Sequence, residues 1–181
     1  NSISWDDFQP VSGQIERPGP NQITAKLGQA PLILMLSSDK LAQLSEDNWM
    51  SFMRECDGTS ALGISLLFWS KNNTGQRPDL TIAEGIFPGI PSKRAIPMKL
   101  LREGRGTPKT PGSLISFAFG AGVHLDEWSR FAISVNDFYG SENRTVALSD
   151  FQFTEQEPDY PVGDQIVVDE IGQWKQASFK D

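Results

Sequence analysis

Few side chains in this sequence have the type and spacing that catalysis requires. The single histidine, His124, stands close to Asp126 and Glu127, which would suit an acid–base pair. No nucleophile stands at a recognisable offset from it, and a histidine in a surface turn explains the same pattern. The single cysteine, Cys56, has an arginine and two acids nearby with opposing effects on a thiol. We therefore expect a structural thiol and no enzyme activity in this chain.

Composition excludes several function classes. The 181 residues include 16 Lys and Arg against 23 Asp and Glu, for a net charge of −7 and no basic run. Such a chain is a poor partner for nucleic acid or an anionic membrane. One cysteine and one histidine rule out a disulfide framework, a zinc ribbon and a multi-histidine metal site. No apolar run reaches membrane-spanning length, and no signal peptide or initiator Met is visible, so we expect a processed protein or an excised fragment.

Alternating apolar and polar residues predict an all-β fold. The stretch 130–136 places Phe131, Ile133 and Val135 on one face, as a half-buried strand does. Similar runs, separated by Gly, Pro, Asn and Asp, occupy 22–27, 32–36, 64–70, 113–120 and 149–153. The pattern predicts an antiparallel jelly-roll β-sandwich over 1–156, followed by a linker and tail over 157–181. The segment 39–53 partly fits a helix, so we expect a short helix or irregular loop there.

The residues opposite the predicted core faces are small or polar, with one large exception. If Ile64, Leu66 and Phe68 face the core, Trp69 lies on the other side of its strand. An indole ring stacks on the apolar face of a sugar, while amide, guanidinium and hydroxyl groups bind the sugar hydroxyls. Packing of Trp69 under a loop is the alternative. The predicted ligand-binding set is Trp69, Arg130, Asn136, Gln152 and Ser116. The tryptophans expected to pack rather than bind are Trp5, Trp49 and Trp128.

Acidic residues suggest a second candidate site. Asp6 and Asp7 open the expected first strand, and Asp150 opens the last. First and last strands lie side by side in many sandwiches, so Asp7 and Asp150 are candidate ligands for a structural Ca²⁺, which prefers oxygen ligands. Simple solvation of strand ends explains the same residues.

Two strand segments resemble jelly-roll carbohydrate-binding modules. Trp5-Asp-Asp-Phe-Gln9 resembles the D-D-F-E-like opening strand of such modules, and Leu148-Ser-Asp-Phe-Gln-Phe153 resembles their closing L-D-D-I-R-L-type strand. In the tail, Val167-Val-Asp-Glu-Ile-Gly-Gln-Trp-Lys175 is similar to the V-D-x-F-G-Q-Y-K segment of β-agarases of glycoside hydrolase family 50. In that family the segment joins an N-terminal module to a (β/α)₈ barrel that cleaves agarose.

The resemblance implies a non-catalytic module of an agar-degrading hydrolase, extracellular or periplasmic, with a catalytic barrel in the same polypeptide. Its ligand would be agarose or a related galactan, and its catalytic carboxylates would lie outside this chain. Trp174 replaces the Tyr of the family segment and is expected to pack against that missing partner. A neutral galactan suits an acidic chain, although Arg102, Arg105 and Lys109 offer a local counter-charge.

Two other functions stay open. The module could pack on a barrel and shape its cleft without binding glycan. It could also be a sandwich-fold lyase or hydrolase, for which Tyr139, Tyr160 and His124 are the available acid–base groups.

Overall fold

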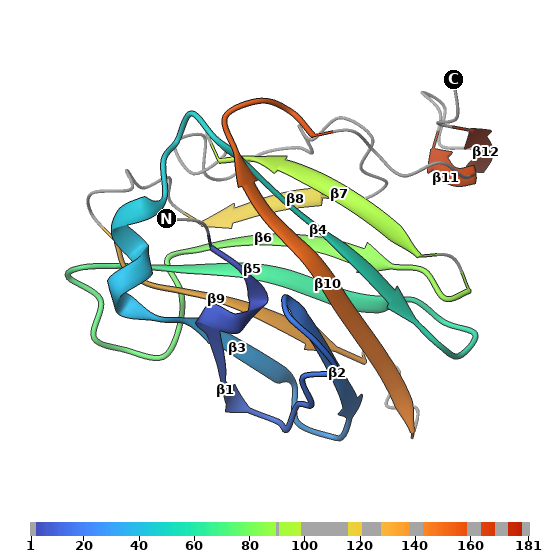
Figure 1. Ribbon diagram of the computed structural model, residues 1–181, viewed down its shortest axis with the longest axis horizontal. Coiled ribbons are helices and arrows are strands. Elements are labelled where there is room, and N and C mark those ends of the chain that lie inside the picture. The colour runs from blue at the N-terminus through green and yellow to red at the C-terminus, as the bar shows by residue number, and fades with distance from the viewer. Residues whose placement is uncertain are drawn as a thin grey trace.

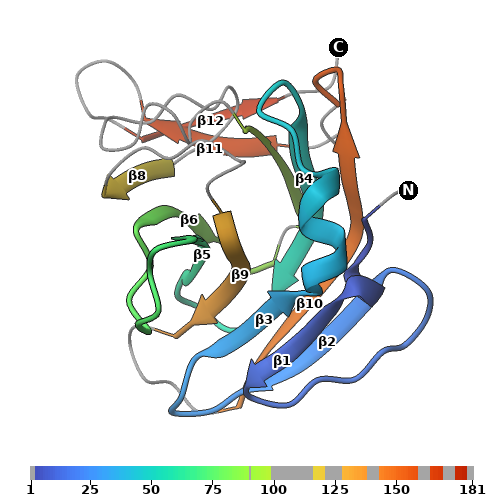
Figure 2. The ribbon, with the colours of Figure 1, turned by 90° about the vertical axis from the view of Figure 1, so that its left-hand side faces the viewer.

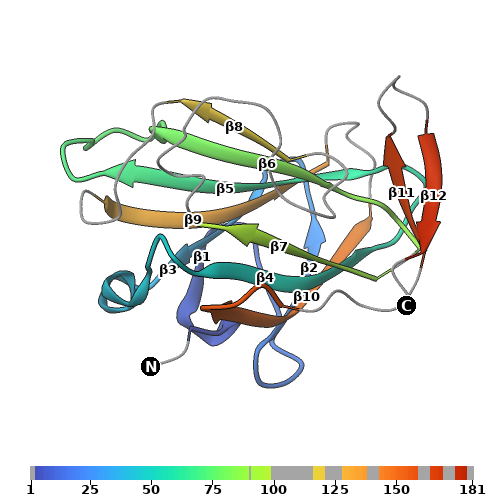
Figure 3. The same cartoon turned by 90° about the horizontal axis from the view of Figure 1, so that it is seen from above.

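The computed structural model describes residues 3–89, 91–98, 116–120, 128–137, 143–158, 164–168 and 174–178. Two antiparallel sheets face each other as a sandwich, as seen from above in Figure 3 and from the side in Figure 2. The six-stranded sheet has the order β1 (Phe8–Ser12), β3 (Leu32–Leu36), β9 (Trp128–Asn136), β5 (Leu62–Ser70), β6 (Leu80–Ile86), β8 (Ser116–Gly120). The four-stranded sheet has the order β2 (Gln22–Leu27), β10 (Arg144–Thr154), β4 (Trp49–Cys56), β7 (Ser92–Pro97). The predicted antiparallel jelly-roll β-sandwich is confirmed (Figure 1).

The core forms where the inner faces of the sheets meet. Ile64, Leu66 and Phe68 are at most 2% exposed, as their alternation in the sequence predicts. Phe68 stacks on Phe131 of the neighbouring strand, with ring centroids 4.8 Å apart. Burial of these apolar side chains is the main favourable contribution to folding.

The N-terminus is held in the core by one aromatic ring and one amide. Trp5 is fully buried, and its ring centroid lies 5.1 Å from those of Phe8 and Phe52 and 5.2 Å from that of Phe151. The Asn21 side-chain oxygen accepts hydrogen bonds from the backbone N–H of Trp5 (2.8 Å) and of Phe151 (3.2 Å). Trp5 was expected in the first strand, but it lies in the 3₁₀ turn η1 (Trp5–Asp7), because its ring turns inward before β1 begins.

The predicted helix or irregular segment at 39–53 is only partly correct. A short 3₁₀ helix, η2, covers Ser38–Gln43, and the strand β4 begins at Trp49. Met50 and Phe52 are buried while Trp49 and Met53 are half-buried, so these four side chains follow the two-residue period of a strand, and the small Ser51 between them is buried as well. In the sequence, the nearly continuous apolar run from Trp49 to Met53, interrupted at Ser51, hides that period.

The predicted tail contains strand structure. β11 (Asp164–Val168) pairs with β12 (Trp174–Ser178) in a separate two-stranded antiparallel sheet. The segment 167–175, which carries the resemblance to agarases, includes the end of β11 and the start of β12. No helix in the described ranges has the length and apolar character needed to cross a bilayer.

A buried arginine anchors the turn after β4. The Arg144 side chain is 5% exposed, and its Nη2 donates to the carbonyl oxygens of Asp57 and Ser60, both at 2.6 Å. Its Nη1 lies 3.8 Å from a carboxylate oxygen of Asp137, which is itself buried. Cys56 lies against this cluster, and burial raises the pKa of its thiol, in keeping with a structural role.

Gly58 shows how closely the turn fits this arginine. It has φ +86°, and a Cβ at this position would overlap Arg144 Nε. We expect Gly58→Ala to lower the free energy of unfolding by about 2 kcal/mol, because both strain and overlap are introduced. Urea unfolding of the 181-residue chain measures the change. Gly28→Ala is the control, since a Cβ there meets nothing within 4 Å. Equal midpoints for the two variants would contradict this account of the turn.

Candidate functional site

The strand register separates the predicted ligand-binding residues. Trp69 and Arg130 lie opposite each other on β5 and β9, on the outer face of the six-stranded sheet. Asn136 is on that face too, but six residues farther along β9, about 20 Å from Arg130 at ~3.3 Å per residue. Gln152 lies opposite Ser51 in the other sheet, whose outer face points the opposite way. These four residues therefore do not share one surface, and their role in ligand binding stays a prediction from the sequence.

The candidate Ser116 lies in β8, an edge strand of the six-stranded sheet. It stands opposite Glu84 of β6, and its side chain is not among those that the structure describes. Its role as a ligand-binding residue stays a prediction from the sequence.

Trp69 is buried and does not form an open platform. Its residue surface is 5% exposed, and its indole N–H donates to the Gln76 carbonyl oxygen at 3.0 Å. The Arg130 guanidinium covers the ring, with Cζ 4.8 Å from the ring centroid. The ring thus packs under the loop between β5 and β6, which was the alternative for this residue.

Arg130 also holds the backbone of the β5–β6 loop, residues 71–79. Its Nη2 donates to the carbonyl oxygens of Asn73 (3.1 Å) and Gly75 (2.7 Å). The Asn73 side-chain oxygen in turn accepts the Gly75 N–H at 2.9 Å. The loop lies at the same end of the sandwich as η2 (Figures 1 and 3). Side chains from two strands therefore fix a loop that its own sequence would leave flexible.

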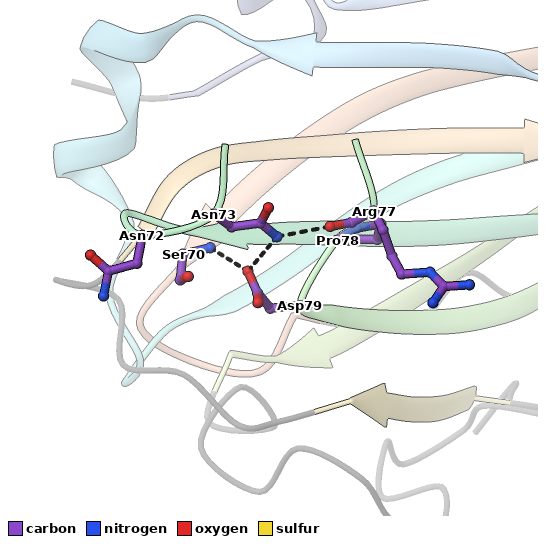
Figure 4. A pocket seen from close by; sticks show the side chains of 6 residues that line it. All are labelled: Ser70, Asn72, Asn73, Arg77, Pro78 and Asp79. Carbon is purple, nitrogen blue, oxygen red and sulfur yellow. Dashed lines mark hydrogen bonds between the residues drawn. The ribbon is translucent and has the colours of Figure 1, made fainter. Parts of the chain in front are cut away.

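Asp79 closes the base of the loop (Figure 4). Its Oδ2 accepts the Ser70 backbone N–H at 2.7 Å and the Asn73 amide at 3.0 Å. These hydrogen bonds, the one from Ser70 foremost, lower the pKa of the Asp79 carboxyl. The Asn73 amide also donates to the Arg77 carbonyl oxygen at 2.8 Å, so the network joins both ends of the loop.

A pocket of about 470 Å³ opens over this network. Its walls are formed by Ser70, Asn72, Asn73, Arg77, Pro78 and Asp79. Asn73 and Asp79 are engaged in the network, whereas the exposed side chains of Asn72 and Arg77 make no hydrogen bond or ion pair within the described part of the chain. In Figure 4 the Arg77 side chain extends away from Asp79. The pocket can therefore offer an amide and a guanidinium to a ligand from a rigid base.

The candidate calcium ligands already have cationic neighbours. Asp7 lies 3.8 Å from Lys40 Nζ, and Asp150 lies 3.9 Å from Lys93 Nζ. Asp7 also accepts the Ser4 N–H at 2.9 Å as part of an N-terminal capping box. Among the described residues, no three His, Cys, Asp or Glu side chains gather as a metal group. The calcium site stays a prediction from sequence, and an ion there would have to compete with two lysines.

The remaining predicted groups lie outside the described residues. They are His124, Arg102, Arg105, Lys109, Tyr139, Tyr160 and the side chain of Trp174.

The sequence pattern does not predict the pocket. The Asn- and Gly-containing stretch 72–75 indicates a turn between two strands, which the structure contains. The available signal was chemical, because amide, guanidinium and carboxylate side chains follow one another within the ten residues after Trp69. Several polar, planar groups in one turn favour ligand binding as well as turn formation.

Comparison with solved structures relates the fold to parts of larger proteins. The chain superimposes on PfGH50B with a TM-score of 0.60 and 13% identity, covering 87% of this chain and 24% of that one. It superimposes on the agarase AgWH50C with a TM-score of 0.54 and 14% identity, covering 83% and 23%. An exo-beta-agarase gives a TM-score of 0.51 and 10% identity, covering 87% and 23%. The chain thus spans about a quarter of each, and at these identities the likeness shows the shared fold.

Neither a protein-family model nor a curated protein sequence matches the chain.

The Asp79 network predicts a pH-dependent contribution to stability. Folding lowers the pKa of the Asp79 carboxyl from its unfolded value, near 3.8. Its contribution to stability is therefore fully present above that pH, and it is lost as the pH falls through the lower pKa of the folded state. We expect Asp79→Asn to lower the free energy of unfolding by about 1 kcal/mol at pH 7, because charge-assisted hydrogen bonds are lost. The difference from wild type should vanish well below pH 3.8.

Urea unfolding at a series of pH values measures this difference. Asp47→Asn, at an exposed site, is the control and should show a smaller effect. A difference for Asp79→Asn that is the same at every pH would contradict the proposed role of its charge.

Proposed function

We propose that this chain is a non-catalytic β-sandwich module of a larger agarase-type glycoside hydrolase, and that it contacts a galactan chain through the pocket of the β5–β6 loop. The observation that carries the proposal is the shared fold over 83–87% of this chain with about a quarter of two agarase structures. A catalytic barrel in the same polypeptide and an extracellular or periplasmic location belong to the same proposal.

The chemistry of the pocket supports contact with a sugar. Ring and chain hydroxyls are bound by planar polar groups that donate and accept hydrogen bonds in fixed directions. Asn72 and Arg77 provide such groups, and the hydrogen bonds of Asn73 and Asp79 hold the loop that carries them. Because the loop is already ordered, little conformational entropy is lost when a ligand binds. Because none of the described residues that line the pocket is aromatic, the site is expected to bind weakly, with Kd of about 1 mM.

The state of Asp79 supports a binding role over a catalytic one. A general acid in glycoside hydrolysis needs a raised pKa, so that it carries a proton near neutral pH. Hydrogen bonds do the opposite to Asp79, because they lower its pKa and hold the carboxylate ionised. This carboxylate is suited to holding the loop in place.

A structural role alone is the second candidate. The burial of Trp69 and its cover by Arg130 support it, because they remove the aromatic stacking surface that the sequence had suggested. In that case the module would pack against a catalytic barrel and bind no galactan by itself.

Affinity electrophoresis of the 181-residue chain in agarose gels separates these candidates. We expect the wild type to be retarded relative to a gel without galactan. Asn72→Ala should weaken retardation about fivefold, because one amide contact is worth about 1 kcal/mol. Gln29→Ala removes an exposed amide elsewhere and is the matched control.

Two outcomes would count against galactan binding at this pocket. Equal migration of the wild type in both gels would favour the structural role. Retardation that Asn72→Ala leaves unchanged would place the binding site elsewhere on the chain.

A further inference from the structure

The β5–β6 loop carries positive charge on an otherwise acidic chain. Lys71 and Arg77 lie in the loop and Arg130 lies beneath it, whereas Asp79 is the acidic residue of the pocket. The chain as a whole carries a net charge of −7. Because charges farther than about 8 Å are screened at physiological ionic strength, a ligand at the pocket responds mainly to this local surplus.

The three cations have different surroundings. Arg130 is committed to Asn73, Gly75 and the Trp69 ring. The exposed side chains of Lys71 and Arg77 make no hydrogen bond or ion pair within the residues that the structure describes. Arg77 also lines the pocket, so its guanidinium, which has no partner among the described residues, is a permanently charged donor at the place where a ligand would sit.

The acidic residue of the pocket does not cancel this charge. Asp79 Oδ2 is directed at the Ser70 N–H and the Asn73 amide, and the Arg77 side chain extends away from it (Figure 4). The loop therefore satisfies its own carboxylate internally and leaves the guanidinium available. A site for a neutral sugar does not need the carboxylate and the guanidinium to be kept apart. A site for an anionic group does, because the guanidinium has to remain available to the anion.

We propose that the pocket recognises an anionic substituent, a sulfate ester or a carboxylate, on the galactan chain, with Arg77 as the main anion-binding group and Lys71 and the Asn72 amide beside it. This inference rests on the proposed function, and it names the substrate class more narrowly than an unsubstituted agarose. A planar guanidinium binds two oxygens of a sulfate or carboxylate at once, which gives direction as well as charge.

Affinity electrophoresis in carrageenan gels, whose galactan carries sulfate esters, tests the proposal against agarose gels of equal content. We expect the wild type to bind carrageenan about tenfold more tightly than agarose at 50 mM salt, and the preference to shrink at 300 mM salt. Arg77→Gln should abolish the preference. Arg77→Lys should retain part of it, because lysine keeps the positive charge but lacks the planar guanidinium that binds two oxygens at once. Within the described residues the Arg77 side chain is exposed and makes no hydrogen bond or ion pair, so both variants are expected to fold as the wild type does.

Lys26→Gln removes one exposed positive charge from β2, in the other sheet, and is the matched control that should keep the preference. Equal retardation in both gels, or a preference that Arg77→Gln leaves intact, would overturn the inference while galactan binding itself stands. Retardation in neither gel would overturn both the inference and the proposed function.

Discussion

The burial of the apolar inner faces of the two sheets is the constraint on which the rest of the structure depends. A sandwich of this size is stable only when these faces are covered. Trp5, Phe52 and Phe151 meet in that core, so the aromatic residues that could bind a sugar are used for packing. What remains for function lies at the ends of the strands, where loops leave the sandwich and side chains do not have to cover the core.

Trp69 and Arg130 show how packing and function are connected. The pair lies side by side on two strands and, instead of facing a ligand, fixes the loop above it through the Gln76 and Gly75 carbonyl oxygens. The Arg130 guanidinium packs on the Trp69 ring, and the hydrogen bonds from both side chains hold the loop rigid. Asn72 and Arg77 lie in the loop that this pair holds in place, and we propose that they contact the ligand.

Local alternation was enough to predict the all-β fold and the inner face of β5, because a half-buried strand repeats its pattern every two residues. It failed at Met50 to Met53, where a nearly continuous apolar run hid the period. It also placed Gln152 with Trp69, although they lie in different sheets. Which strands share a sheet depends on long-range pairing, and no short window of sequence contains that information. The pocket was missed for the same reason, since Arg130 reaches the loop from 55 residues away.

The most direct test of the central claim, that the β5–β6 loop is the ligand-binding surface, is NMR mapping of backbone amide shifts during titration with a galactan oligosaccharide. The account predicts that the largest shifts occur in residues 70–79, with smaller ones at Arg130, whose guanidinium holds that loop. Shifts confined to the four-stranded sheet, or no shifts at millimolar ligand, would contradict it.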